Sequence, residues 1–228
     1  MFTNTNLTAP IGALALLGTG FLLLMLALAF VYTLAKRKFR ANKLVFAGAT
    51  VIVSLYLVVL LLFSFTSHEQ ALARGQEKHF CELDCHLAYS ILDVTDSKTI
   101  GAPPSQATAA GTFRMVTIKT RFDEGTISPN RGNGLLYPNS RVVTLVDDQG
   151  RKYLPAAEAQ RVLEASKLSG SPLNTPLRPS ESYTTTFAFD LPADAHNLTL
   201  TINEGEWLTH FVIGHENSPL HKQTKFQL

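Results

Sequence analysis

Two cysteines and two histidines lie within eight residues of one another in this 228-residue chain, at Cys81, Cys85, His79 and His86. The chain contains no other cysteine. In an exported domain, two cysteines so close together most often form a disulfide. Thiolates are also soft ligands that select copper or zinc, and imidazole suits both metals. The segment therefore predicts a disulfide, with a metal site and free thiols as the alternatives.

The spacing of the two cysteines restricts the backbone that a disulfide can use. Side chains four residues apart on a helix have Cβ atoms roughly 5–6 Å apart. A disulfide needs about 3.5–4.5 Å between Cβ atoms. A bond between Cys81 and Cys85 therefore requires a turn, whereas two thiolates at about 2.3 Å from one zinc ion tolerate a wider gap.

The elements that must carry this segment begin with two apolar runs, Pro10–Ala35 and Leu44–Ser67, which contain no Asp, Glu, Lys, Arg or His. At 1.5 Å per residue, each run as a helix is long enough to cross a hydrocarbon core of about 30 Å. A chain in lipid must satisfy its own backbone hydrogen bonds. The sequence therefore predicts a transmembrane hairpin over residues 1–67, with helices over about 10–35 and 44–67.

Positive charge between the two runs predicts the orientation of the hairpin. All five Lys and Arg residues of the first 67 lie in the connection 36–43, which the positive-inside rule places in the cytoplasm. This predicts a multi-pass protein of a bacterial inner (cytoplasmic) membrane, with both termini outside. A cleaved signal peptide is the alternative interpretation of the first run. However, no basic residue precedes that run, and it is longer than the apolar part of a signal peptide. The basic residues are Lys36, Arg37, Lys38, Arg40 and Lys43.

Small residues on both runs predict a surface for close helix contact. The two helices can use it to pack on each other, or another integral membrane subunit can dock there. Neither run carries an ionisable group of the kind that proton relays and ion paths need, which argues against a transporter. The predicted docking residues are Gly12, Gly18, Gly20, Gly48 and Ser54.

The remaining 161 residues are enough for one domain with its own core. They hold all 18 acidic residues and 15 Lys and Arg, and no basic stripe interleaved with aromatic residues, so nucleic-acid binding is not expected. Residues 68–80 favour a short helical stalk. Residues 81–228 predict an extracytoplasmic all-β domain with one short helix at 156–168 and a loop at 101–111. The expected strands are 87–94, 113–122, 141–146, 152–154, 182–189, 198–202, 211–213 and 224–228.

Two stretches of the β domain resemble a known family. Val143–Tyr153 holds an Asp-x-x-Gly hairpin followed by Tyr, and Leu177–Pro192 contains Leu-x-Pro-Ser-Glu, a strand and Phe-Asp-x-Pro. These stretches look like the telokin-like, immunoglobulin-fold domains of bacterial surface and membrane-anchored proteins, which usually have Gly where this chain has Ser180. The resemblance implies an immunoglobulin-like β-sandwich of about seven strands and no catalytic residues.

The cysteine segment has a resemblance of its own. Cys-x-x-x-Cys with a nearby His looks like the binding loop of Sco copper chaperones and of the dinuclear copper site in oxidase subunits. This resemblance implies a copper site built from His79, Cys81, Cys85 and His86. The segment departs from both patterns, because His86 follows Cys85 directly, no Met lies nearby, and no Pro follows the cysteines.

The sequence contains no nucleophile elbow, catalytic-triad motif or phosphate-binding glycine loop, so we do not expect an enzyme. Trp207, the single tryptophan, is expected to pack in the core or at a strand end, where it could also anchor a partner. These observations predict a non-enzymatic accessory subunit of a larger membrane complex, respiratory or photosynthetic, with membrane subunits and lipid as partners and no cofactor. The alternatives are a membrane-anchored copper-binding or copper-delivery protein and a surface-exposed adhesion or sensor module.

Overall fold

The structure is a computed structural model, and it describes residues 8–80, 85–126 and 131–228. Within these ranges the chain divides into two compact units. One contains residues 8–68 together with Trp207–Lys222, and the other contains Glu69–Glu206 together with Gln223–Leu228. The helical unit therefore includes a late segment of the chain that the sequence analysis assigned to the β domain.

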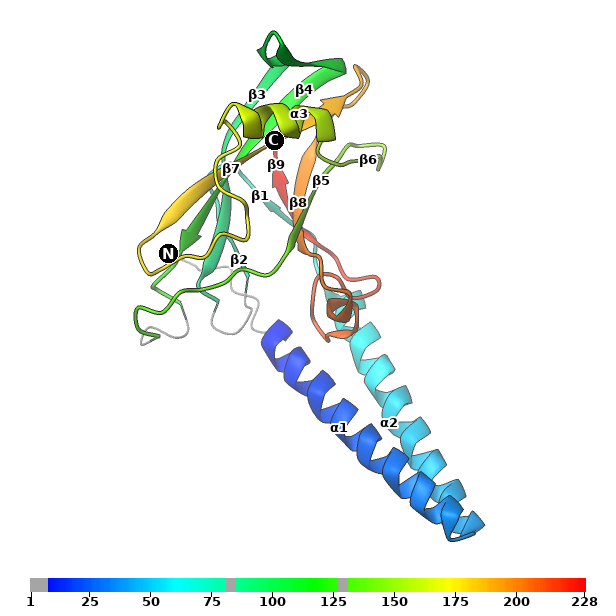
Figure 1. The fold of residues 1–228 in the computed structure, drawn as a ribbon. Coiled ribbons are helices and arrows are strands. Elements are labelled where there is room, and N and C mark those ends of the chain that lie inside the picture. The colour runs from blue at the N-terminus through cyan, green and yellow to red at the C-terminus, as the bar shows by residue number, and fades with distance from the viewer. Residues whose placement is uncertain (1–7, 81–84, 127–130) are drawn as a thin grey trace. The chain divides into compact units, whose positions relative to one another are not determined.

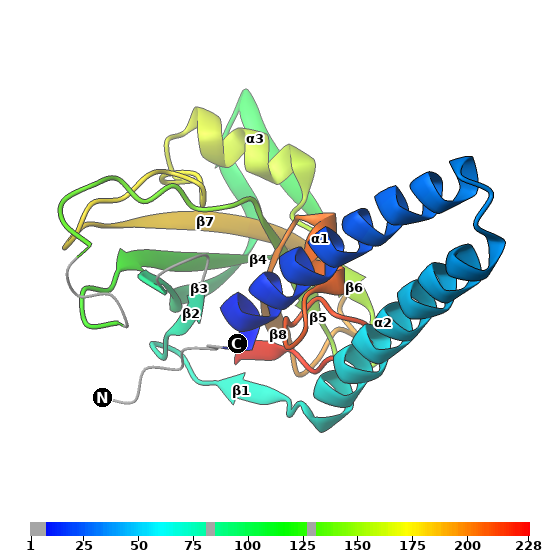
Figure 2. The same cartoon turned by 90° about the horizontal axis from the view of Figure 1, so that it is seen from below.

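The helical unit is built on two 28-residue helices, α1 (Thr8–Ala35) and α2 (Phe39–Thr66). They run antiparallel and side by side (Figures 1 and 2). Both are long and apolar enough to cross a membrane by length and composition. Most of their large apolar side chains are exposed, as expected for helices that face lipid or other helices rather than a core of their own.

The connection between the helices is shorter than the predicted loop 36–43. Arg37 takes a left-handed conformation with φ of 54°, the N–H of Arg37 donates to Leu34 O, and the N–H of Lys38 donates to Thr33 O. This is the Schellman pattern that ends a helix. Lys36, Arg37 and Lys38 thus form the turn, whereas Arg40 and Lys43 lie in the first turns of α2.

The second unit is a β-sandwich of two sheets (Figure 1). The first sheet has the strand order β1–β9–β8–β5–β6 and the second β2–β3–β4–β7. Neighbouring strands pair antiparallel, except that β1 pairs parallel with β9. The strands are Gln70–Leu72 (β1), Lys78–Phe80 (β2), Leu87–Ala102 (β3), Ser105–Phe122 (β4), Arg141–Val146 (β5), Lys152–Tyr153 (β6), Ser182–Leu191 (β7), Thr199–Glu204 (β8) and Thr224–Gln227 (β9).

The core of the sandwich follows the alternation of side chains along the strands. On β4, Val116 and Ile118 are fully buried, and they pack in one cluster with Leu145 and Leu200 of the other sheet. Each fully buried side chain of this size contributes roughly 1.5–3 kcal/mol to folding. The largest side chains of the core are those of Tyr89, Phe189 and Phe226.

A short helix, α3 (Ala157–Ala165), covers the outer face of the second sheet (Figure 1). Val162 and Leu163 are buried on its inner side and pack with Ile100, Phe113 and Ala188 from β3, β4 and β7. The sequence predicted this helix over 156–168, and the structure confirms it with slightly tighter bounds.

Three predicted elements are wrong. The loop predicted at 101–111 lies mostly within the long β3–β4 hairpin, where Ala107 and Ala109 alternate with polar residues and pack under α3. The helical stalk predicted at 68–80 contains β1 and β2, because pairing at the sheet edges outweighs helix propensity here. The strand predicted at 211–213 is absent, and a 3₁₀ helix, η1 (Trp207–Phe211), ends at its first residue.

Candidate functional site

The cysteine segment connects two strands of the second sheet. Phe80 at the end of β2 pairs antiparallel with Leu87 at the start of β3, so the cysteine segment falls between two paired strands in the sequence. Cys85 is fully buried and takes a left-handed conformation with φ of 57°. Cys81 lies outside the described residues, so the disulfide between Cys81 and Cys85 stays a prediction.

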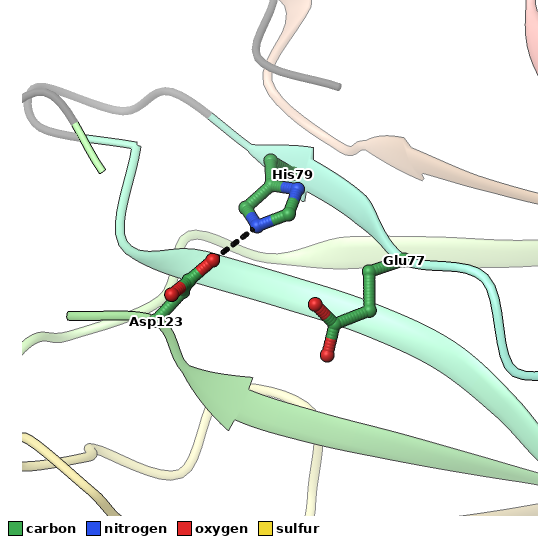
Figure 3. Close-up of side chains that lie close together, drawn as sticks. All are labelled: Glu77, His79 and Asp123. Atoms are coloured by element: carbon green, nitrogen blue, oxygen red, sulfur yellow. Dashed lines mark hydrogen bonds and ion pairs between the residues drawn. The ribbon is translucent and has the colours of Figure 1, made fainter. Parts of the chain in front are cut away.

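The histidine before this connection belongs to a cluster on the outer face of the second sheet (Figure 3). His79 Nε2 lies 2.8 Å from Asp123 Oδ2, and ligand-type atoms of Glu77, His79 and Asp123 all lie within 4.8 Å of one another. The side chain of His79 is only 3% exposed and that of Asp123 is 12% exposed. Among the described residues, this is the group whose spacing fits a metal ion.

Alternation along the strands explains how these side chains meet. Ala88 on β3 pairs with His79 on one side and with Arg121 of β4 on the other, so the three share one row across the sheet. The small, buried side chain of Ala88 leaves room for its longer neighbours to reach each other above it. Leu87 and Tyr89, on either side of Ala88, face the core instead.

Arg121 supplies positive charge to the cluster. Its guanidinium makes two hydrogen bonds to the carboxylate of Glu77, at 2.8 and 2.7 Å, and lies 3.3 Å from Asp123 Oδ2. The hydrogen bond from Arg121 lowers the pKa of Glu77. Burial alone would raise the pKa of Asp123, but hydrogen bonds from His79 and from the Gly125 N–H, with the charge of Arg121, hold it below its usual value.

This charge balance decides against a metal as the natural occupant. A metal ion between Glu77, His79 and Asp123 would have to compete with Arg121 for both carboxylates. The donor set of two carboxylates and one imidazole also lacks the soft ligands that favour copper. The cluster therefore acts as an ion-pair network that joins the strand ends of β2 and β4.

His86, like His79, is held by residues that follow β4. Its contacts are with the carbonyl oxygen of Asp123 and with Thr126 rather than with the Asp123 carboxylate. Its Nδ1 lies 2.6 Å from the carbonyl oxygen of Asp123 and 2.8 Å from Thr126 Oγ1, and its ring stacks on Phe122. Because a carbonyl oxygen only accepts, Nδ1 carries the proton. The predicted copper ligands His79 and His86 are thus both engaged with Asp123, and the structure does not bring them together with Cys85 as one ligand group among the described residues.

A second group of charged side chains lies at the core edge of β2. Lys78 is buried, donates to Ile202 O of the opposite sheet at 2.8 Å, and lies 4.8 Å from the centre of the Phe80 ring. The guanidinium of Arg141, from β5, lies 4.1 Å from the same ring centre. Cations over an aromatic face are attracted to it. These contacts tie the two sheets together around Phe80.

Glu77, Arg121 and Asp123 were not among the residues predicted from the sequence. A signal was present, because Glu77 and His79, and likewise Arg121 and Asp123, stand two residues apart and so point to one side of an extended chain. The first pair was missed because residues 68–80 were predicted to form a helical stalk. The second pair stands at the end of a correctly predicted strand, where its partners could not be identified without the sheet order.

The predicted docking residues of the helices have two different environments. A Cβ atom at Gly12 would overlap the carbonyl oxygen of Ile213, so this chain's own segment 207–222 already covers that position. Gly18, Gly20 and Gly48 have open space where a side chain would begin, and Ser54 is exposed. These four positions are available to another helix.

The chain matches none of the known protein-family models and none of the curated proteins. Three solved structures match part of this chain. MPT63, a secreted protein from Mycobacterium tuberculosis, is 13% identical with a TM-score of 0.43, over 72% of this chain and 100% of its own. A conserved hypothetical protein from Bacillus anthracis is 13% identical (TM-score 0.41, 57% of this chain, 89% of its own), and the yjhA protein from Bacillus subtilis is 12% identical (TM-score 0.41, 69% and 98%). All three TM-scores lie below 0.5, so the family predicted from the sequence stays a prediction.

Proposed function

We propose that this chain is a non-enzymatic accessory subunit of a larger bacterial membrane complex, of the respiratory or photosynthetic kind. The observation that carries the proposal is the open space at Gly18 of α1 and at Gly48 of α2, two small positions that this chain leaves uncovered. Gly20, two residues from Gly18, is also open but lies on the other side of α1. Small residues let helix backbones approach closely, and close packing drives helix association in lipid. A surface of this kind that its own chain leaves open fits a second membrane protein.

The proposed orientation follows from charge. Both helices lack Asp, Glu and His, and the positive charges gather at Lys36, Arg37 and Lys38 in the turn and at Arg40 and Lys43 beside it. The positive-inside rule then puts this turn in the cytoplasm and the β-sandwich outside the inner membrane. In that oxidising compartment the proposed disulfide between Cys81 and Cys85 closes the β2–β3 connection.

We also propose that the sandwich is of the telokin-like, immunoglobulin type. In the hairpin Val143–Tyr153, Asp147 accepts hydrogen bonds from the N–H groups of Gln149 and Arg151, from the Arg151 side chain, and from the Tyr153 hydroxyl. Ser180, which stands where the family usually has Gly, has a φ of 67°. Glycine adopts that conformation most easily, so the position behaves as the family pattern implies.

Purification of the full-length chain through a C-terminal tag in a gentle detergent tests the subunit proposal. We expect stoichiometric integral membrane partners and no copper, with metal analysis made on the same sample. A chain that purifies alone with about one equivalent of copper, lost on Cys85→Ser, would overturn the proposal in favour of copper delivery.

A matched pair of variants locates the docking surface. Gly18→Leu fills the open space on α1 and should reduce partner recovery. Ala27→Leu adds similar bulk at an exposed position nine residues away, which is about two and a half helical turns and therefore on the opposite side. Equal partner recovery in the two variants, at a wild-type amount of inserted protein, would contradict docking at Gly18.

A further inference from the structure

The segment Trp207–Lys222 belongs to the helical unit, although in the sequence it lies between β8 and β9 of the sandwich. Four contacts fix it to the helices. The Tyr56 hydroxyl donates to Phe211 O at 2.6 Å, Gly12 lies against Ile213, Gly214 lies against Thr8, and the N–H of Lys222 donates to Ser67 Oγ at 2.8 Å. The segment therefore lies along one end of both helices.

The position of Tyr56 gives the depth of this segment along α2. Tyr56 stands ten residues before Thr66, so it lies about 15 Å from the end of α2. A hydrocarbon core of about 30 Å that starts just after Lys43 includes about 20 residues and so ends near Phe63. Tyr56 lies inside that range, and Phe211 is hydrogen-bonded to it.

Backbone groups near lipid must have partners within the protein. Within the segment, the N–H of Val212 donates to Thr209 O, that of His215 to Val212 O, and that of Ser218 to His215 O. The side chain of Ser218 also donates to Val212 O. This irregular stretch thus satisfies part of its backbone by itself.

The outward side of the segment exposes four large apolar side chains, beside the exposed His210 and Lys222. Trp207 is 67% exposed, Leu208 53%, Phe211 46% and Leu220 63%, while Val212 and Ile213 are buried on the inward side. The rings of Trp207 and Phe211 meet edge to face at 5.8 Å. The prediction that Trp207 packs in the core is therefore wrong, and the prediction that it anchors a partner stays a prediction. Tryptophan beside large apolar residues is typical of the boundary between lipid headgroups and acyl chains.

We propose that Trp207, Leu208, Phe211 and Leu220 insert into the outer-leaflet interface of the bilayer, so that segment 207–222 is a third membrane contact beside α1 and α2. The inference rests on the proposed membrane span of the two helices. Lipid is the occupant because the hydrogen bond to Tyr56 holds Phe211 beside a residue of the span, and because the helices of the same unit also expose large apolar side chains.

Trp207 is itself the probe for a direct test, because the chain has no other tryptophan. The full-length protein is reconstituted into phosphatidylcholine vesicles brominated either near the headgroup end or near the methyl end of the acyl chains. We expect Trp207 to emit at a shorter wavelength than tryptophan in water. We also expect it to lose most of its fluorescence with bromine near the headgroup and less with bromine near the methyl end.

Two variants in a Trp207→Phe background calibrate the measurement. Phe21→Trp, in the middle of α1, should be quenched most by bromine near the methyl end. Tyr137→Trp, at an exposed site of the sandwich, should be quenched by neither lipid. The three tryptophan positions therefore report depth on one scale.

The outcomes separate this inference from the proposed function. Unquenched Trp207 in a protein that resists carbonate extraction, with Phe21→Trp quenched, would overturn the inference and leave the span intact. Release by carbonate, with no quenching at Phe21→Trp, would overturn both. Emission of Trp207 that shifts to shorter wavelength only when a membrane partner is bound would assign the patch to a protein and overturn the lipid assignment.

Discussion

Asp123 is the residue on which most contacts of the β2–β3–β4 edge depend. Its side chain accepts from His79, Arg121 and the Gly125 N–H, its own N–H donates to His86 O, and its carbonyl accepts from the His86 ring. One residue after a strand thus holds two histidines that the sequence analysis considered as copper ligands. Their role in the described structure is to fasten the connection that carries Cys85.

Asp123→Asn should lower the free energy of unfolding by about 1–3 kcal/mol, because the buried His79 and the half-buried Arg121 lose a charged acceptor. Urea unfolding of the full-length protein in detergent, followed by circular dichroism, measures the change. Asp93→Asn is the control, since Asp93 pairs with Arg74 at 3.7 Å on the surface and such pairs contribute about 0–1 kcal/mol. Equal effects of the two substitutions would contradict the network.

Asp147 makes the stability of the sandwich depend on pH in the acid range. Burial would raise the pKa of Asp147, but the hydrogen bonds from Arg151 and Tyr153 lower it from 3.8 to about 2. A lowered carboxyl pKa stabilises the fold fully above the ordinary value, and this stability is lost as the pH falls from about 4 towards 2. Asp147→Asn should therefore flatten the loss of thermal stability in that window.

Thermal unfolding at a series of acid pH values measures the effect of Asp147→Asn. Asp148→Asn serves as the control, because Asp148 is exposed and accepts a single side-chain hydrogen bond from Asn197. A variant at position 147 with the same acid profile as the wild type would show that this carboxylate does not stabilise the hairpin.

At the scale of elements, α3 shows how a short helix supports a long hairpin. Leu163 is 1% exposed and packs with residues of β3 and β4 beyond the main core. Leu163→Ala should cost about 2–5 kcal/mol of unfolding free energy. Glu164→Ala, one residue further on the exposed side, should be nearly neutral, and the comparison is made by urea unfolding of the full-length protein.

The elements that were predicted correctly are those whose pattern of apolar and polar residues lies within the element itself. Arg141–Val146 was predicted with the observed bounds, and α3 and the two apolar helices were predicted within a few residues. The outer part of the β3–β4 hairpin, residues 95–112, was missed because Ala107 and Ala109 pack under α3, and small residues give little hydrophobic signal. The edge strands β1 and β2 were missed because their short sequences become strands only through partners far away in the chain.

The charged cluster could not be predicted from the sequence for a related reason. Glu77, His79, Arg121 and Asp123 meet only because β3 places Ala88 between β2 and β4. Nothing local to any of the four residues predicts that sheet order. By contrast, the small residues Gly18, Gly20 and Gly48 can be identified from the sequence, and their role in docking stays a prediction.

For the whole molecule, the proposed topology makes a prediction of its own. Alkaline phosphatase fused after Leu228 should be active in a bacterial host, because that enzyme folds only outside the cytoplasm, where its disulfides form. The same enzyme inserted in the turn at Lys38 should be inactive. A green fluorescent protein fused after Leu228 should stay dark, and bright fluorescence there would invert the orientation.

The parallel pairing of β1 with β9 has a consequence for biosynthesis. Glu69, just before β1, forms an ion pair with Lys225 of β9, which lies 156 residues later, and Phe226 of β9 is fully buried. While a ribosome is still making β8, β1 has no partner and the first sheet lacks its inner strand. Chains that fold through such long-range pairs do so slowly and expose strand edges meanwhile. We therefore expect the newly made sandwich to need protection, for example by a chaperone, until its last strand has emerged.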